Sequence, residues 1–543
     1  MAPPTLRRDQ LLAGLAAIAA TQSFTNSAHA QVTSQPVGAA AAQPPVVAGR
    51  QSLGPAGYSL RYGDVRSLLM RGDFDGALSL FQTVPVAAQT QQNAEAQEVA
   101  APTGAAADDS QARRPLFSSR DVFLANSEVG LMHYECNRHQ EAMTSFEAAR
   151  ATGGDSGGVR NRLGQAGRWL GNRARQAAGV VLGRGDFGPY RKRDYEGVLQ
   201  LNYLALNFMI QGDRRCYNVA RASADEQEQL RARFAEQVAE AQQSLQQEQA
   251  SDNGKTTNMV NTLNPEFTSY APIANRVPSA YVNPFGPYVS GVALEIASLE
   301  QPALRGNARG AYEEALALAP ARTQLTQAVQ AMNDNHTPGT RVVHVIVAEG
   351  FAPSRNVLRY GLPMDDGAVL PLRMGVFVPE ISAVNRVDAA FTSGPANARR
   401  PVTLDPISDV EALVLRDQSD RLLFMWLDLL VSAYRDRQTE ALEAQINQFM
   451  GNQPISLDSV PDLRSWCSLP RRVHVARLIA PPGVNEVAIT TRSSAGVLQR
   501  RTVALDPQNQ QTLIYARATN DVLRVDTSRR LWVDGVDLNA SAG

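Results

Sequence analysis

The sequence predicts an α+β protein in which helices come first and strands follow. Between residues 58 and 330, apolar residues recur at helical spacing and are interrupted by short Gly-Asp breaks. From Arg341 onward the pattern changes to β-branched runs bounded by Pro and Gly. The chain has 543 residues, too many for a single core, so we expect more than one domain.

The first 57 residues are expected to lie outside the folded part. Two arginines and the short apolar stretch LLAGLAAIAA precede the small-residue motif AHA, which ends at Ala30. This order predicts a signal peptide over 1–30, cleaved after Ala30 by the general or the twin-arginine export route, and hence a periplasmic protein. Residues 31–57 are rich in Ala, Gln, Pro and Gly without periodicity, which is typical of a disordered linker.

Helix-turn-helix copies then predict an irregular TPR-like α-solenoid over 58–330. In such a repeat small residues let the two helices approach, and an aromatic residue fills the groove between them. Gly130 takes the small position and Phe146 the aromatic one in NSEVGLMHYECNRHQEAMTSFEAAR. Other copies are RSLLMRGDFDGALSLF, DYEGVLQLNYLALNFMIQGDRRCYNVARA, and FGPYVSGVALEIASL followed by NARGAYEEALALAP.

The stretch HYECNRHQEA also has the residue types of a metal site. His133 and Cys136 could share one helix face, but His139 lies past the interhelix turn and points elsewhere, and no fourth ligand is near. Each of these residues has a packing position in the repeat instead. We therefore expect no metal at this place.

Two segments interrupt or extend the helices. A Gln- and Ala-rich stretch predicts a disordered insert over about 86–115. Residues 224–250 form a polar helix with a thin apolar stripe, which either packs on the other helices or binds a partner.

The C-terminal part is expected to be an antiparallel β-rich domain over 341–530. Its strand signals include RVVHVIVAEG, AVLPLRMGVFVPEI, RTVALD and QTLIYARA, and two strands flank a Pro-Pro-Gly turn in RRVHVARLIAPPGVNEVAITTRSS. A long helix over about 409–450 is inserted, and 531–543 is a tail.

Charge and hydropathy exclude several classes of protein. The formal net charge is −1, with 52 basic and 53 acidic residues, so no field favours nucleic acid. No stretch after the signal is long and apolar enough to cross a membrane. The three cysteines are few and odd in number, which does not fit a disulfide framework, and buried thiols are the simpler interpretation.

No catalytic, cofactor-binding or metal-binding residue is predicted. GRGDFG (183–188) matches a dinucleotide motif only formally, because Pro189 follows where a helix should begin. His344 and His474 alternate with β-branched residues and are expected to be structural. Asp365 and Asp366 are expected in a solvated turn. A last group (Asp462, Arg464 and Trp466) could form a polar pocket, although a structural corner with a packed Trp is favoured.

Several stretches resemble a family of bacterial cell-envelope proteins that is functionally uncharacterised. They are DYEGVLQLNYLALNFMIQGD, AYVNPFGPYVSGV, VIVAEGFAP and DLRSWCSLPRRVHVARL, which together cover most of 190–490. The last is the most specific, through Arg464, Trp466, Leu469 and Pro470. The resemblance implies an export signal, irregular TPR-like helices, a β-rich C-terminal region and no known catalytic residues. Many members look like lipoproteins, whereas this chain lacks the lipobox cysteine, which puts membrane anchoring in doubt.

The sequence therefore predicts a non-enzymatic interaction scaffold of the bacterial cell envelope, because stacked helical repeats offer a concave groove to a partner protein. The partner is an envelope or secreted protein, with peripheral association to the outer membrane left open. Residues expected on the inner face are Tyr62, Arg66, Tyr134 and Asn202. The alternative is an envelope glycan-binding or glycan-processing protein that acts through the C-terminal β domain.

Overall fold

The computed structural model describes residues 65–82, 117, 121–151, 190, 192–248, 269–333, 341–363, 369–420 and 463–528. This part of the chain combines helices and strands, so the α+β prediction is confirmed. The predicted signal peptide, linker, insert and tail lie outside the described residues, as do GRGDFG, Asp365, Asp366 and Asp462.

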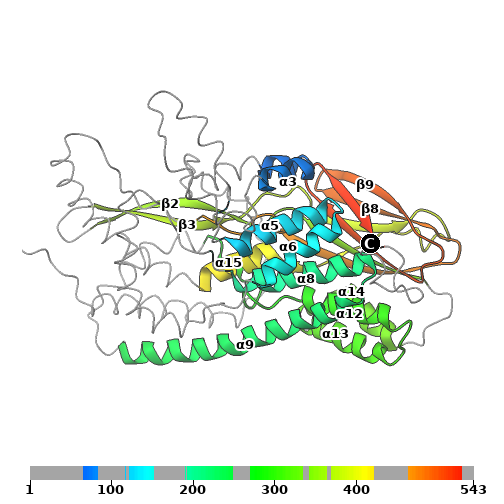
Figure 1. Ribbon diagram of the computed structural model, residues 1–543, viewed down its shortest axis with the longest axis horizontal. Helices are drawn as coiled ribbons and strands as arrows, with labels where there is room; N and C mark the ends of the chain where they lie inside the picture. Colours follow the sequence, from blue (N-terminus) through cyan, green and yellow to red (C-terminus); the bar gives the residue numbers. More distant parts are fainter. Residues whose placement is uncertain are drawn as a thin grey trace, which may run out of the picture.

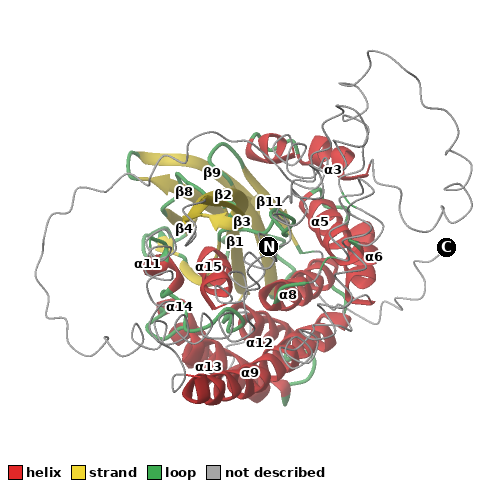
Figure 2. Ribbon diagram, turned by 90° about the vertical axis from the view of Figure 1, so that its left-hand side faces the viewer, coloured by secondary structure: helices red, strands yellow, loops and turns green. Residues whose placement is uncertain are grey.

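The helices form successive antiparallel pairs. Residues 65–70 are helical. The helices that follow in the N-terminal part are α3 (Phe74–Gln82), α5 (Val122–Glu135), α6 (His139–Ala151), α8 (Asp194–Gln211), α9 (Arg215–Glu248), α11 (Ala271–Ala274), α12 (Phe285–Ala297), α13 (Leu304–Leu318) and α14 (Thr323–Asn333). Pairs α5–α6, α8–α9 and α12–α13 each pack together, and neighbouring pairs are in contact. Figure 2 shows the helices as a crescent around the sheets.

Small residues let the paired helices approach closely. A Cβ added at Gly130 of α5 would lie 2.9 Å from Cδ1 of Phe146 on α6, and one at Gly291 of α12 would lie 2.6 Å from Cε1 of Tyr312 on α13. Gly130 and Phe146, assigned to the small and aromatic positions of residues 126–150, thus lie where the two helices meet. Gly212 ends α8 with φ +78°, a left-handed conformation that glycine adopts without strain.

The strands build three separate sheets. They are β1 (Arg341–Glu349), β2 (Ser354–Pro363), β3 (Val369–Val378), β4 (Arg386–Phe391), β5 (Val402–Thr403), β6 (Asp405–Asp409), β7 (Arg472–Ala480), β8 (Glu486–Ser493), β9 (Gly496–Ala504), β10 (Gln511–Ala518) and β11 (Leu523–Thr527). The larger sheets have the orders β11-β10-β1-β7-β6 and β5-β4-β8-β9. β2 and β3 form a ribbon that extends away from them (Figure 1). The described part of the predicted long helix is α15 (Val410–Asp420).

The prediction of an antiparallel β domain needs one correction. β1 and β10 pair in parallel, whereas the other paired strands are antiparallel. After β7 the chain leaves the five-stranded sheet to build β8 and β9, and it returns beside β1 in the same direction. Strand patterns report which residues are extended but not the direction of their neighbours.

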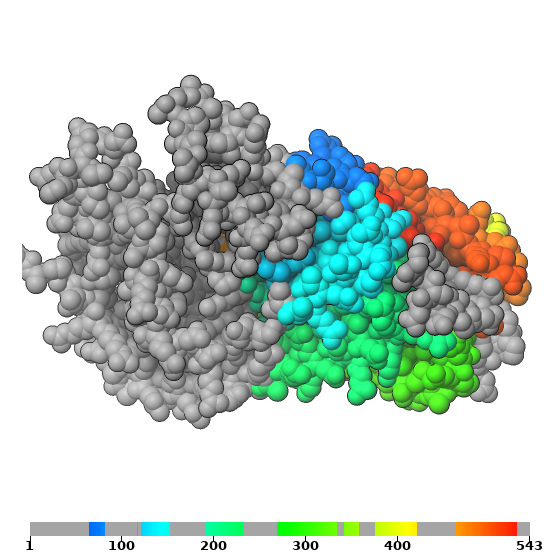
Figure 3. All heavy atoms as spheres, viewed as in Figure 1, coloured from blue at the N-terminus to red at the C-terminus, as the bar shows by residue number. Residues whose placement is uncertain are grey.

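Alternating side chains divide the β domain between two cores. On β1, Val343, Val345 and Val347 face the four-stranded sheet, whereas Ile346 and Ala348 belong to the core shared with the helices. The five-stranded sheet is thus a middle layer, with the helices on one face and the second sheet on the other (Figure 2). Figure 3 shows residues 121–151 lying directly against the C-terminal strands.

Candidate functional site

Three of the predicted partner-binding residues are described, and they lie at the boundary between the layers or within the helices. Tyr62 is outside the described residues. Arg66 contacts the C-terminal domain: its Nη1 lies 2.8 Å from Oε1 of Glu380, and its Nη2 donates to the carbonyl of Ala352 at 3.1 Å. Its side chain is 14% exposed. Arg66 thus binds the C-terminal part of its own chain and not another protein.

Tyr134 and Asn202 are buried, which corrects the expectation that they face a groove. Tyr134 is 1% exposed, and its ring packs edge-on against Tyr515 of β10 at 4.8 Å between centroids. Asn202 is fully buried between helices and accepts a hydrogen bond from Ser223 Oγ at 2.6 Å. Where Tyr134 lies, the inner side of the crescent is covered by the protein's own sheet, so a partner could reach it only after the layers separate.

The segment 463–470, the most specific part of the family resemblance, is buried between helices and sheet. The amide of Cys467 donates to Glu128 of α5 at 2.9 Å, and that of Trp466 donates to Glu196 of α8 at 3.2 Å. Arg464 pairs with the buried Asp121. Trp466 is 1% exposed, so the predicted packed tryptophan is confirmed. The segment joins both layers and presents none of these side chains to solvent.

Burial governs the protonation of Glu128. Removal from water raises its pKa to about 8, although Ser468 and the amide of Cys467 donate hydrogen bonds that favour the carboxylate. The pKa of Glu196 is raised for the same reason, against the bonds from the amide of Arg193 and from Tyr190. Two buried carboxyl groups therefore lie beside one segment. Glu128 and Glu196 both accept hydrogen bonds from backbone amides of segment 463–470, so their role is structural.

A third buried carboxyl group, Glu295, is kept ionised by its partners. Glu295 of α12 receives Arg477 of β7 through Nη2 at 2.7 Å and Nε at 3.1 Å. His344 lies 3.9 Å from the same carboxylate and 3.0 Å from Gln511 Oε1. Burial would raise the pKa of Glu295, but His344 and Arg477 outweigh it and hold the pKa below its usual value. The predicted structural role of His344 thus corresponds to a polar link between layers.

The His-Cys-His stretch spans the turn between α5 and α6, as the repeat pattern predicts. Nδ1 of His139 lies 3.0 Å from Oδ1 of Asn207, whose Nδ2 donates to the carbonyl of His139, and Nε2 lies 2.9 Å from Asp526 Oδ2. Within the described part of the chain no group of at least three His, Cys, Asp or Glu side chains could hold a metal ion. Cys136 is half-buried and unbridged, and Cys216 and Cys467 are buried and unbridged.

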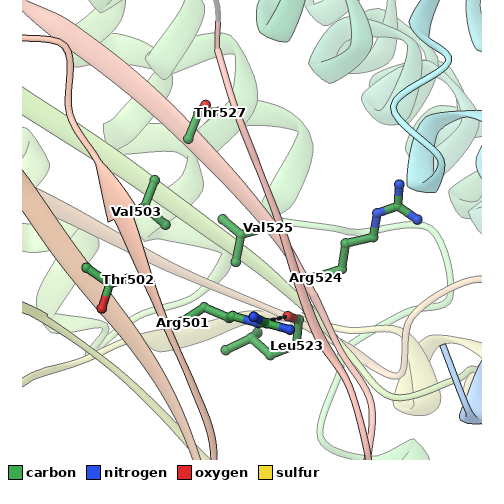
Figure 4. Close-up of a pocket in the computed structure, with 7 residues that line it drawn as sticks. All are labelled: Arg501, Thr502, Val503, Leu523, Arg524, Val525 and Thr527. Carbon is green, nitrogen blue, oxygen red and sulfur yellow. Dashed lines mark hydrogen bonds between the residues drawn. The ribbon is translucent and has the colours of Figure 1, made fainter.

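An open cleft lies between the edges of the two larger sheets. It has a volume of about 380 Å³ and is lined from β9 and β11 by Arg501, Thr502, Val503, Leu523, Arg524, Val525 and Thr527. Figure 4 shows Val503 and Val525 facing each other across it, while Arg524 points away toward the helices. At one end Nε of Arg501 donates to the carbonyl of Leu523 at 3.3 Å. The cleft lining is thus mixed: Val503, Leu523 and Val525 are apolar, and Arg501 gives the cleft a basic end.

Both strands of the cleft are edge strands of the described sheets, and sequence analysis missed β11. The amide of Ser528 donates to the carbonyl of Leu513 on β10, which fixes the hydrogen-bond pattern of the β10–β11 ladder. In this pattern the backbone N–H and C=O groups of every second residue of β11 point away from β10, toward the open edge. These residues are Leu523, Val525 and Thr527. The alternation of apolar and charged residues in LRVDT, after the turn residues Asn520 and Asp521, is the signal that could have found this strand.

The chain matches no family model, no curated protein and no solved structure. Among the helices the structure describes, none combines the length and the apolar character needed to cross a bilayer.

Proposed function

We propose that this chain is a non-enzymatic interaction scaffold of the bacterial cell envelope, exported by the signal over residues 1–30. Its helix pairs are irregular TPR-like repeats. The close contacts of Gly130 with Phe146 and of Gly291 with Tyr312 support this, because such repeats need a small residue opposite an aromatic. The resemblance of 190–490 to an envelope family supports the location.

The surface offered to the partner is the β9–β11 cleft rather than the inner side of the crescent. One observation carries this proposal: two edge strands lie side by side with a cleft between them, and the edge of β11 keeps backbone groups unpaired within the described sheets. Exposed edges of this kind accept an extended segment of another protein as an added strand. The helical layer packs against the five-stranded sheet, to which β11 belongs.

A photo-crosslinking amino acid at the exposed Thr502 of β9 tests the proposal in the native envelope. We expect light-dependent adducts with one or a few envelope or secreted proteins, identified by mass spectrometry. The matched control carries the same group at the exposed Arg309 of α13, on a different part of the surface.

Adducts at Thr502 that are absent at Arg309 would support an interaction surface at the cleft. Equal adduct patterns at the two positions, or no protein adduct at Thr502, would contradict it.

A further inference from the structure

We infer that the β9–β11 cleft takes an extended protein segment in which apolar and acidic residues alternate, paired with the open edge of β11. This inference rests on the proposed function and specifies the chemistry of the partner. It follows from the backbone of β11, from the apolar residues Val503, Leu523 and Val525 in the cleft lining, and from the charge beside the cleft.

The backbone of β11 supplies the pairing groups. The carbonyl of Leu523 already accepts a bond from Arg501, and the amide of Thr527 donates to the side chain of Asp526 at 2.8 Å. Val525, midway between them, turns both its N–H and its C=O to the open edge. An added strand would bond to Val525 as a β10 residue bonds to its neighbour across the ladder.

The cleft walls select every second side chain of the added strand. Leu523 and Val525 on β11 belong to the apolar core between the sheets or pack against it, and Val503 on β9 closes the other side. A side chain that continues this row enters the cleft and loses contact with water. An apolar residue therefore fits at alternate positions, because a buried polar group there would lack partners.

The charge around the cleft selects the remaining side chains. Arg501 lines the cleft on the same side of β9 as Val503, and it pairs with no acidic side chain of the described residues. Arg524 points to the helix side of β11 over the ring of Phe74, at 5.4 Å from its centroid. The acidic neighbour on β11, Asp526, faces His139. The positions outside the cleft lie on the helix side of an added strand, so carboxylates there complement Arg524, whereas lysines would be repelled.

The test uses the mature full-length protein and fluorescent synthetic peptides that alternate valine with glutamate or valine with lysine. We expect saturable anisotropy changes with the glutamate peptide, at least about tenfold weaker binding of the lysine peptide, and loss of binding when the glutamate peptide is N-methylated on its pairing edge. Val525→Pro removes the outward N–H but no bond to β10, so the fold is retained and binding falls at least about tenfold.

Val525→Ile is the matched control, because it keeps the N–H, the β-branched shape and the apolar character, and we expect it to bind like the wild type. Unchanged binding by Val525→Pro, or no binding of the glutamate peptide up to about 1 mM, would overturn the inference. Binding that requires deletion of residues 529–543 would also overturn it, since the occupant would then be the chain's own end. Protein adducts at Thr502 without peptide binding would leave the proposed function standing and reject only this partner chemistry.

Discussion

At the scale of single residues, the two layers are joined by buried carboxyl groups with different ionisation. Glu295 has a lowered pKa beside His344 and Arg477, whereas burial raises the pKa of Glu128 to about 8. The guanidinium of Arg477 beside Glu295 accounts for the difference, because Glu128 is held by a hydroxyl and a backbone amide. A protonated, neutral Glu128 suffices to bind segment 463–470, whereas the link from α12 to β7 depends on the ionised carboxylate of Glu295.

Replacement of Glu128 by Gln should therefore reduce the pH dependence of stability. The folded wild type keeps a proton on Glu128 that the unfolded chain releases above the usual pKa of 4.5. Its stabilising contribution is complete below that value and is lost as the pH rises through about 8. One such proton changes the free energy of unfolding by at most about 1.4 kcal/mol per pH unit. Urea unfolding between roughly pH 5 and 9, a range set by this shift, measures the slope.

Glu141→Gln is the control, because Glu141 is exposed on α6, and its slope should equal that of the wild type. The raised pKa values of Glu135 and Glu196 act in the same direction, so Glu128→Gln should flatten the slope without removing it. An unchanged slope in Glu128→Gln would contradict the assignment.

At the scale of elements, helix pairs are specified by the residues at their closest approach. The pattern of Gly130 and Phe146 was readable from the sequence because both lie within one hairpin of helices. The exposed Gly310 of α13 is a glycine of another kind: a Cβ added there would meet nothing within 4 Å. The same residue type thus has opposite consequences at the two positions.

Gly130→Ala should destabilise the protein by about 1–3 kcal/mol, because its Cβ would overlap the ring of Phe146 in a packed core. Gly310→Ala should stabilise it by about 0.5–1 kcal/mol, since alanine is the better helix former and space is open. Chemical denaturation midpoints of both variants against the wild type measure these changes. If both substitutions changed the free energy of unfolding equally, helix propensity would account for their effects, and the close-packing argument for Gly130 would be wrong.

At the scale of the whole molecule, the helices and the middle sheet share one core. Leu131 and Tyr134 of α5 lie in the same apolar cluster as Ile346 of β1 and Leu513 of β10. Neither layer can bury its facing surface alone. The helical region should therefore depend on the C-terminal domain for its fold.

Fragments that end at Asn333 and begin at Arg341 should co-purify in equal amounts when they are expressed together. Expressed singly, the helical fragment should bind a hydrophobic dye and unfold without a cooperative transition, because its sheet-facing surface is exposed. Size exclusion with calorimetry makes the comparison. A helical fragment that unfolds cooperatively by itself would mean that the two parts are separable domains.

Local patterns in the chain predicted much of the fold. Helical spacing placed α5, α6, α8 and α12, a Gly-Asp turn marked the end of α8, and β-branched runs placed β1, β7 and β10. These signals depend on neighbours a few residues apart. The small position of Gly130 and the aromatic position of Phe146 could be assigned for the same reason.

The tertiary structure alone decided which surfaces meet. Tyr134 has the pattern of a groove residue, but its partner is Tyr515, far along the chain, and the helix sequence does not encode which surface arrives there. Likewise, the cleft between β9 and β11 exists only because the two sheets place these edge strands side by side. Spacing along a chain specifies which side chains share a face. What covers that face depends on the burial of apolar surface by the whole molecule.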